Sequence, residues 1–213
     1  YFARPTKRGG AWMSGFRTQS KIDGKVVRPI VVNVLNCSKG AEGQKTLITL
    51  GDAKTLFHEF GHALHGMLTD VTYPSIAGTN VPRDFVEFPS QVYEHWLLQP
   101  QVLAGFARHA ETGAPIPQDL VERIRASEKF NIGWGQVEYC SSAIVDLDLH
   151  LMSPPENFDI VAFERDALAK IGMPREIVMR HRTPHFAHVF SGSGYSAGYY
   201  SYLWSAVLDR DGF

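Results

Sequence analysis

The residues best suited to chemistry lie in one short stretch, "LGDAKTLFHEFGHALHGMLTD", residues 50–70, which holds His58, Glu59, His62 and His65 within eight positions. Histidines four residues apart share one face of a helix and can direct two imidazoles at one metal ion. A glutamate between them is placed to act as a general base toward a water molecule. His58, Glu59 and His62 form this H-E-x-x-H pattern and therefore predict a zinc site. The alternative is a core helix whose histidines are hydrogen-bonded to neighbours.

The helix that carries this pattern is expected to run from Asp52, a good N-cap, to about residue 69. Gly61 and Gly66 flank the histidine face, where an exposed helix would carry lysine or glutamate. We therefore expect the histidine face to be covered or to line a cleft, since a buried polar group without a partner costs about 1–3 kcal/mol. The opposite face is apolar and should also be covered: Leu56, Phe60, Ala63 and Met67.

A catalytic zinc site takes three protein ligands and leaves one coordination position open. His65 is a poor third ligand, because three ligands on one rigid helix would lie in a row. Gly66 follows His65 rather than preceding it, so the pattern with a third histidine after a glycine turn does not fit either. His65 is therefore expected to pack near the site, and the third ligand should come from another element.

Glu87, 25 residues after His62, is the candidate for that ligand. It lies in "PRDFVEFPSQVYEHW", where Pro89 fits the first turn of a helix and places Glu87 at or near the helix start. Glu94 falls close to the same helical face. Glu87 alone could be a solvated carboxylate at a helix start, but its apolar neighbours argue against free exposure.

The rest of the pattern predicts a mainly α protein with a small β-sheet near the N-terminal end, an α+β fold. Tyr1 opens in a predicted strand, and β-branched residues predict two more strands, at 28–37 and 45–50. Beyond residue 50 the periodicity is helical. The predicted helices are 52–69, 88–98, 101–109, 118–150 with a break near Gly133 and Gly135, 157–171 and 197–208.

Composition excludes some classes of function. The formal net charge is −1, so nothing favours nucleic acid or an anionic membrane as a partner. No apolar run approaches the roughly 20 residues of a membrane span. Cys37 and Cys140 match no metal or redox spacing, so we expect a reducing compartment and a cytoplasmic location. Both ends of the chain suggest a piece of a longer protein.

Three stretches carry a resemblance to a known family: "FHEFGHALH", "GTNVPRDFVEFPSQVYEHW" and "HFAHVFSGSGYSAGYYSYLW". They resemble the thimet oligopeptidase family of zinc metallopeptidases, and within it the bacterial peptidyl-dipeptidases. The resemblance covers nearly the whole chain. It implies that residues 1–213 are the zincin-like catalytic domain of a protein several times longer, with the missing N-terminal half packed against it.

The resemblance also implies a set of site residues. His58, His62 and Glu87 would bind one Zn²⁺ per chain, and Glu59 would be the base. In the third stretch the matching residues would contact substrate and stabilise the transition state; they are His188, Tyr195 and Tyr202, with Tyr199 a weaker match. A phenol can donate to developing negative charge, and residues 191–194 give the loop freedom to move. The alternative is that these tyrosines pack a helix, which is what we expect of Tyr200.

The predicted function is zinc-dependent hydrolysis of short unstructured peptides, with release of C-terminal dipeptides. A near alternative is endo-cleavage, as in oligopeptidase A-like relatives. A different class is a non-catalytic binding domain with a structural zinc, which would need a fourth protein ligand and would leave Glu59 unused. A further alternative is a piece that keeps the fold but has little activity without its other half.

Overall fold

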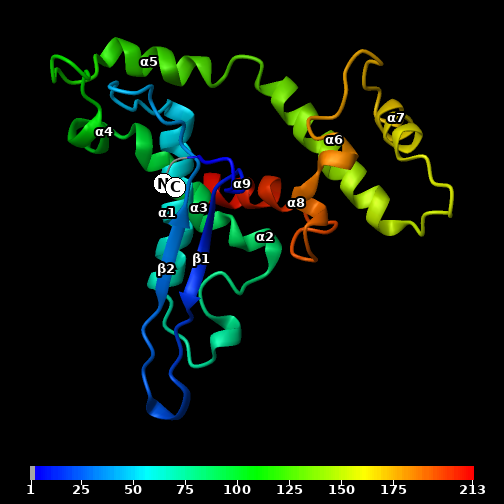
Figure 1. Cartoon of the computed structure of the whole chain (residues 1–213), viewed down its shortest axis with the longest axis horizontal. Helices are drawn as coiled ribbons and strands as arrows, with labels where there is room; N and C mark the ends of the chain where they lie inside the picture. Colours follow the sequence, from blue (N-terminus) through cyan, green and yellow to red (C-terminus); the bar gives the residue numbers. More distant parts are fainter. Residues whose placement is uncertain (1–2) are drawn as a thin grey trace. The chain divides into compact units, whose positions relative to one another are not determined.

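The computed structural model describes residues 3–213 and is mainly helical with one small sheet, which confirms the α+β class (Figure 1). The start of the strand predicted at Tyr1 lies outside the described residues. Contacts divide the chain into two compact units. Unit 1 comprises Tyr1–Ile116 and Ser205–Phe213, and unit 2 comprises Pro117–Trp204.

The sheet of unit 1 is an antiparallel pair, β1 (Trp12–Arg17) and β2 (Ile30–Val34), joined through the short 3₁₀ turn η1 (Ile22–Gly24). Trp12 lies opposite Val34, and Gly15 lies opposite Val31. β2 confirms the strand predicted at 28–37. The strand predicted at 45–50 is wrong, because this segment has no strand pairing and Leu50 already begins a helix.

Helix α1 (Leu50–Met67) begins two residues before the predicted cap. The N-cap is Thr49: its side chain accepts a 3.0 Å hydrogen bond from the Asp52 amide. The Asp52 carboxylate in turn accepts a 2.9 Å bond from the Thr49 amide, which completes a capping box. Asp52 is thus the third residue of the helix, where its charge also complements the helix dipole.

The buried residues of α1 are Glu59, Gly61, Ala63 and Gly66. The apolar face was predicted to be covered. Ala63 is buried as predicted, but Leu56, Phe60 and Met67 are 41–42% exposed. The histidine face is covered, as predicted, because α3 packs on it.

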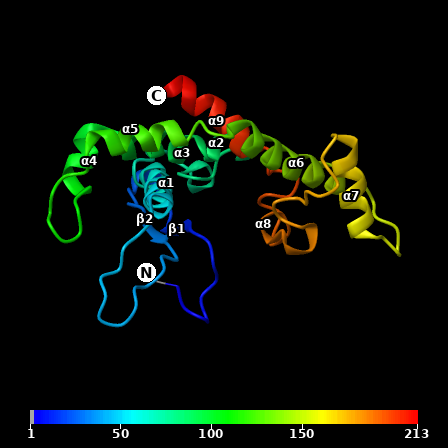
Figure 2. The same ribbon diagram turned by 90° about the horizontal axis from the view of Figure 1, so that it is seen from above.

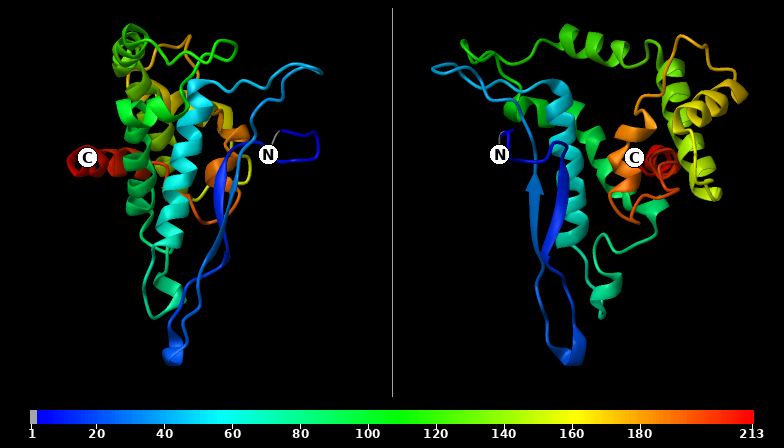
Figure 3. Two further views of the ribbon diagram at one scale, coloured as in Figure 1. Left: turned by 90° about the vertical axis from the view of Figure 1, so that its left-hand side faces the viewer. Right: turned by 45° about the vertical axis from the view of Figure 1, so that its right-hand side comes forward.

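Gly61 sets how closely α3 (Phe88–Glu94) approaches α1. A Cβ atom at position 61 would lie 2.6 Å from Cα of Ser90 and 2.9 Å from the carbonyl oxygen of Pro89. Both are backbone atoms, so a larger residue would force the helices apart. α1 also contacts both strands, and Figure 3 shows the β-hairpin running alongside it.

Short elements complete this part of unit 1: η2 (Pro74–Ile76) and α2 (Arg83–Val86) precede α3, and η3 (His95–Leu98) and α4 (Pro100–Phe106) follow it. The helix predicted at 88–98 is therefore α3 with a 3₁₀ continuation, and the one predicted at 101–109 is α4. Aromatic packing joins α1 to these elements, since Phe57 stacks on Tyr93 at 5.5 Å and lies 6.3 Å from Phe106. The α2 turn was not predicted.

Unit 2 contains α5 (Gln118–Ser127), α6 (Ile132–Leu151), α7 (Ile160–Lys170), η4 (Thr183–His185) and α8 (Ala187–Phe190). The predicted break between 118 and 150 falls just before Gly133, where Asn131 has a left-handed φ of 54°. α6 and α7 lie side by side (Figure 2). The core of this unit is Ala143, Val145, Ala167, Leu168, Met179, Phe186, Val189 and Tyr199.

Helix α9 (Ser201–Gly212) begins in unit 2 and ends in unit 1. It begins four residues later than predicted, since Ala197 has a φ of 56°, which no right-handed helix accepts. In unit 1, the Ser205 hydroxyl donates a 2.9 Å hydrogen bond to the Asp84 carbonyl. Among the described residues, none of the helices is long and apolar enough to cross a membrane.

The glycine contact yields a stability prediction. In the full-length protein, Gly61→Ala should lower the free energy of unfolding by about 1–3 kcal/mol, because the new methyl group overpacks the α1–α3 contact. Gly51→Ala is the matched control in the same helix. Its Cβ would meet only the Thr49 hydroxyl, at 3.6 Å, so helix propensity should raise stability slightly. Denaturant unfolding measures both, and equal stability of Gly61→Ala and parent would contradict the packing argument.

Candidate active site

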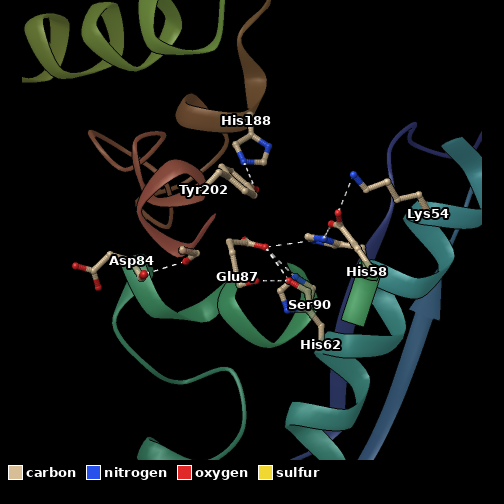
Figure 4. Close-up of polar contacts among 10 residues, drawn as sticks. Lys54, His58, His62, Asp84, Glu87, Ser90, His188 and Tyr202 are labelled. Atoms are coloured by element: carbon tan, nitrogen blue, oxygen red, sulfur yellow. Dashed lines mark hydrogen bonds and ion pairs between the residues drawn. The ribbon is translucent and has the colours of Figure 1, made fainter. Parts of the chain in front are cut away.

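The candidate metal centre lies in unit 1, where α1 presents His58 and His62 and the start of α3 presents Glu87 (Figure 4). Nε2 of His58 lies 3.2 Å from Oε2 of Glu87, and Nε2 of His62 lies 3.1 Å from the same oxygen. One ligand atom from each of the three residues falls within 4.8 Å of the others. The structure thus brings together the three residues that the sequence placed on two elements.

Glu87 is deeply buried in this position. It lies between α2 and α3 at the N-cap of α3, with Pro89 in the first turn as predicted. Its exposed fraction is 1%. The Ser90 hydroxyl lies 2.8 Å from the Glu87 backbone carbonyl and 3.3 Å from its Oε2. A carboxylate this deeply buried needs cationic or hydrogen-bonding partners, and its side chain is aimed at the two imidazoles.

A second carboxylate orients His58 from behind. Nδ1 of His58 lies 2.6 Å from Oε1 of Glu94, and Lys54 Nζ lies 3.1 Å from Oε2 of the same carboxylate (Figure 4). An imidazole that donates from Nδ1 to a carboxylate presents the lone pair of Nε2 to a metal. Lys54, Glu94 and His58 therefore form a chain of contacts that ends at the metal-facing nitrogen.

The same contacts determine the electrostatics of His58. Burial acts to lower its pKa, but the hydrogen bonds and charges of Glu87 and Glu94 outweigh burial and raise the pKa to about 10. Glu94 has the opposite balance: burial acts to raise its pKa, whereas His58 and Lys54 lower it. Two carboxylates thus concentrate negative charge around one imidazole, an arrangement that favours a cation at this point.

Glu59 lies on the same helix but outside the group of three. It is 5% exposed, and its Oε2 forms no hydrogen bond with any described residue. Burial raises the pKa of Glu59, while the nearby His58 and His62 act to lower it. A buried carboxylate of raised pKa, with one oxygen that has no hydrogen-bond partner, is suited to accept a proton.

His65 is separate from the metal-ligand group, as the geometric argument predicted. Its ring lies 6.4 Å from that of Phe85, and burial lowers its pKa. It lines an apolar cavity of about 530 Å³ between α1 and α3, together with Leu64, Leu68 and Val92. This is a packing environment.

Unit 2 gathers the C-terminal candidates into a second cluster. The Tyr202 hydroxyl and Nε2 of His188 share a 2.9 Å hydrogen bond (Figure 4). The Tyr195 ring stacks on Tyr202 at 5.7 Å and lies 4.4 Å from the His188 ring. The structure therefore brings together the imidazole of His188 and the phenols of Tyr195 and Tyr202.

Tyr199 supports this cluster from the interior. Its ring contacts those of His188 and Tyr202 and is 7% exposed, within the core of unit 2. Burial raises the pKa of its hydroxyl. Tyr200 is outside the cluster and 39% exposed.

Sequence reasoning gave no role to Lys54, Glu94 or Ser90, although all three contact the candidate ligands or their partners. The sequence did contain a signal for Glu94, because it lies seven residues after Glu87 and so falls on the same helical face. No signal pointed to Lys54 or Ser90, since their role depends on how closely α1 and α3 approach.

The site defines a class: two imidazoles and a carboxylate on packed helices, beside a buried glutamate, match the donor set of a mononuclear metallohydrolase. Comparison with known proteins agrees. The profile of peptidase family M3 matches residues 1–213, so the chain belongs to peptidase family M3.

Three relatives show where the chain falls within that family. It is 44% identical to dipeptidyl carboxypeptidase of Salmonella typhimurium and 44% identical to dipeptidyl carboxypeptidase of Escherichia coli. It is 37% identical to oligopeptidase A of Escherichia coli. Each match covers all of this chain, which spans about a third of the length of these relatives, 31–32%.

The metal centre yields a graded prediction in the full-length protein. Glu87→Ala should cause the largest loss of divalent-metal affinity, because it removes a ligand. Glu94→Gln should weaken affinity by about 10- to 100-fold, because it weakens the hold on His58. His65→Ala should leave affinity unchanged. Metal titration of the chelated protein measures all three, and a larger loss for His65→Ala than for Glu87→Ala would reverse the ligand assignment.

Proposed function

We propose that this chain is the catalytic part of a zinc metallopeptidase that hydrolyses peptide bonds in short peptides. The observation that carries the proposal is the convergence of His58, His62 and Glu87 beside the buried carboxylate of Glu59. The proposed fold is zincin-like, with residues 1–213 forming one catalytic domain.

Zinc suits the residues present. Two imidazole nitrogens and one carboxylate oxygen are the ligands it binds in peptidases of the H-E-x-x-H type. His58, His62 and Glu87 would hold it, with Glu94 fixing the orientation of His58. When bound, zinc would polarise the scissile carbonyl and lower the pKa of a water molecule.

The chain's own residues would move the proton and hold the charge. Glu59 would accept a proton from the attacking water and then pass it to the leaving amine. Tyr195 or Tyr202 would donate to the negative charge that develops on the carbonyl oxygen, and His188 would hold the substrate backbone. Residues 191–194, a Ser-Gly-Ser-Gly run, supply the loop freedom that substrate entry requires.

A structural zinc is less well supported. A closed structural site has four protein ligands, often cysteines. In the part of the chain that the structure describes, no fourth histidine, cysteine, aspartate or glutamate joins the group of three. Glu59 would also have no use at such a site.

For specificity we propose release of C-terminal dipeptides. The support is the name and identity of the relatives, since the dipeptidyl carboxypeptidases are 44% identical and oligopeptidase A is 37% identical. Endo-cleavage is the alternative outcome of the experiment below.

We further propose that the remainder of a longer protein packs on this chain. Many large apolar side chains are exposed in the described residues, and Phe16, Leu68 and Trp204 are among them. A cytoplasmic location is part of the same proposal, supported by two free cysteines, Cys37 and Cys140.

The testing experiment uses the full-length protein and one unblocked nonapeptide, with products identified by mass spectrometry. Dipeptides released stepwise from the C-terminus, and lost on treatment with chelator, are the expected result. Internal cleavage would favour the oligopeptidase alternative. Turnover that persists in chelator with no bound metal would overturn the metallopeptidase proposal.

Glu59→Gln tests the proposed base. The substitution keeps the side-chain shape and the ligands, so zinc content should stay near one per chain while turnover falls by several orders of magnitude. Zinc content and kcat are measured on the same preparation. Near-normal turnover with zinc bound would remove Glu59 from the mechanism.

Tyr195→Phe and Tyr202→Phe test the proposed donors. Each substitution removes only a hydroxyl that would act in the transition state, so kcat and kcat/KM should fall together by roughly 100- to 1,000-fold with KM little changed. Tyr200→Phe is the control and should stay within a few-fold of the parent. A rise in KM with kcat spared would make both tyrosines substrate-binding residues only.

A further inference from the structure

Unit 2 contains a buried carboxylate that the proposed mechanism does not use. Asp146 lies in the C-terminal half of α6 and is 1% exposed. It belongs to neither the metal centre nor the tyrosine cluster. An ionised side chain this deep in a core is costly unless its oxygens are hydrogen-bonded or paired, so its contacts indicate its purpose.

Those contacts are with the segment that leads into α9. Oδ1 of Asp146 accepts a 3.1 Å hydrogen bond from the Ala197 amide, and Oδ2 accepts a 3.0 Å bond from the Tyr199 amide. His150, one turn further along α6, places its Nδ1 2.8 Å from Oδ1. Both oxygens are thus satisfied, and two of the three partners are backbone amides some fifty residues away in sequence.

The segment needs such an anchor because nothing regular holds it. Residues 191–200 contain no strand or extended helix, and Ala197 adopts a left-handed φ of 56°. A non-glycine residue in that region is strained and persists only where its surroundings fix it. The two bonds to Asp146 lie at Ala197 and at the second residue after it, so they fix the strained position directly.

The anchored segment positions both candidate donors. Tyr195 precedes Ala197 by two residues, and its carbonyl accepts a 2.9 Å bond from Gly198. Tyr202 follows Tyr199 by three residues, in the first turn of α9, and the two rings are in contact. The Tyr139 hydroxyl also donates to the Tyr199 carbonyl, so Tyr199 is held through its amide, its carbonyl and its ring.

We propose that Asp146 is a positioning residue of the active site: its carboxylate fixes the backbone from Ala197 to Tyr199 and thereby the hydroxyls of Tyr195 and Tyr202. The inference rests on the proposed function of those tyrosines. Asp146, a core residue of α6, would thus affect the chemical step through the backbone of the loop.

The test is Asp146→Asn in the full-length protein, with Asp148→Asn as the matched control. Asp148 lies on the same helix and forms no hydrogen bond or ion pair with any described residue. An asparagine offers one acceptor oxygen in place of two and turns an amide donor toward a backbone N–H. Because a displacement of about 1 Å can cost 100-fold in rate, kcat should fall by about 10- to 100-fold. KM and zinc content should stay near the parent's values.

Hydrogen exchange gives a readout independent of activity. In Asp146→Asn, amides of the 195–202 segment should exchange faster, while those of α1 keep the parent rate. A purely structural role would loosen the core of unit 2 generally, including α7. Parent-like exchange at 195–202, or kcat equal to that of Asp148→Asn, would overturn the proposal.

Double variants separate this proposal from the proposed function. If Asp146 acts through the tyrosines, the fold loss of kcat in the double variant Asp146→Asn/Tyr202→Phe should be much smaller than the product of the fold losses of the two single variants. Independent, multiplicative losses would overturn the positioning role and leave the tyrosines' role intact. If neither Tyr195→Phe nor Tyr202→Phe loses activity, the proposed function of the tyrosines fails and the positioning role fails with it.

A folding defect would not end the test. If Asp146→Asn does not accumulate as folded protein, the same substitution is made with Ala197→Gly, because glycine adopts a positive φ without strain. Ala197→Gly alone is then the reference. The expected result is unchanged: kcat of the double variant falls about 10- to 100-fold below that reference. Equal kcat for the two would overturn the proposal.

Discussion

The close approach of α1 and α3 is the constraint on which the candidate metal centre depends. The backbone of α3 at Ser90 lies where a side chain at position 61 would be, so glycine there is a steric condition for the site. That approach carries Glu87 to His58 and His62, and Glu94 to the far side of the His58 ring. A wider separation of the two helices would lengthen the contacts of Glu87 with His58 and His62, which are already 3.1–3.2 Å long.

Burial of charge is the second constraint. Glu87, Glu94 and Glu59 place three carboxylates around two imidazoles in a partly dry region, where like charges repel and each must be offset. His58 and Lys54 offset part of this charge within the described chain. A divalent cation between His58, His62 and Glu87 would offset much of the remainder. The cluster therefore makes electrostatic sense as a cation site, whichever reaction it serves.

Much of this was readable in the sequence, and the exceptions share a cause. Periodicity located α1, α3 and α6, and H-E-x-x-H spacing with a proline-marked helix start selected His58, His62 and Glu87. Local propensity gave the wrong secondary structure where side-chain hydrogen bonds determine the backbone conformation. Thr49 and Asp52 form a capping box, and a helix begins where a strand was predicted. Local propensity failed again at Ala197, whose left-handed conformation is fixed by a carboxylate fifty residues earlier. Such long-range contacts leave no local signal.

The two units use the same physical device for different ends. In unit 1 the Glu94 carboxylate fixes an imidazole, and in unit 2 the Asp146 carboxylate fixes a stretch of backbone. In each case a carboxylate with little solvent exposure accepts hydrogen bonds whose geometry is demanding. The ligands and phenols proposed to meet substrate are flexible side chains that would otherwise sample several rotamers. A carboxylate behind each set restricts this freedom before substrate arrives, Glu94 by holding the His58 ring and Asp146 by holding the backbone that carries the tyrosines. Such preorganisation lets polar groups stabilise a transition state without reorganising during the reaction.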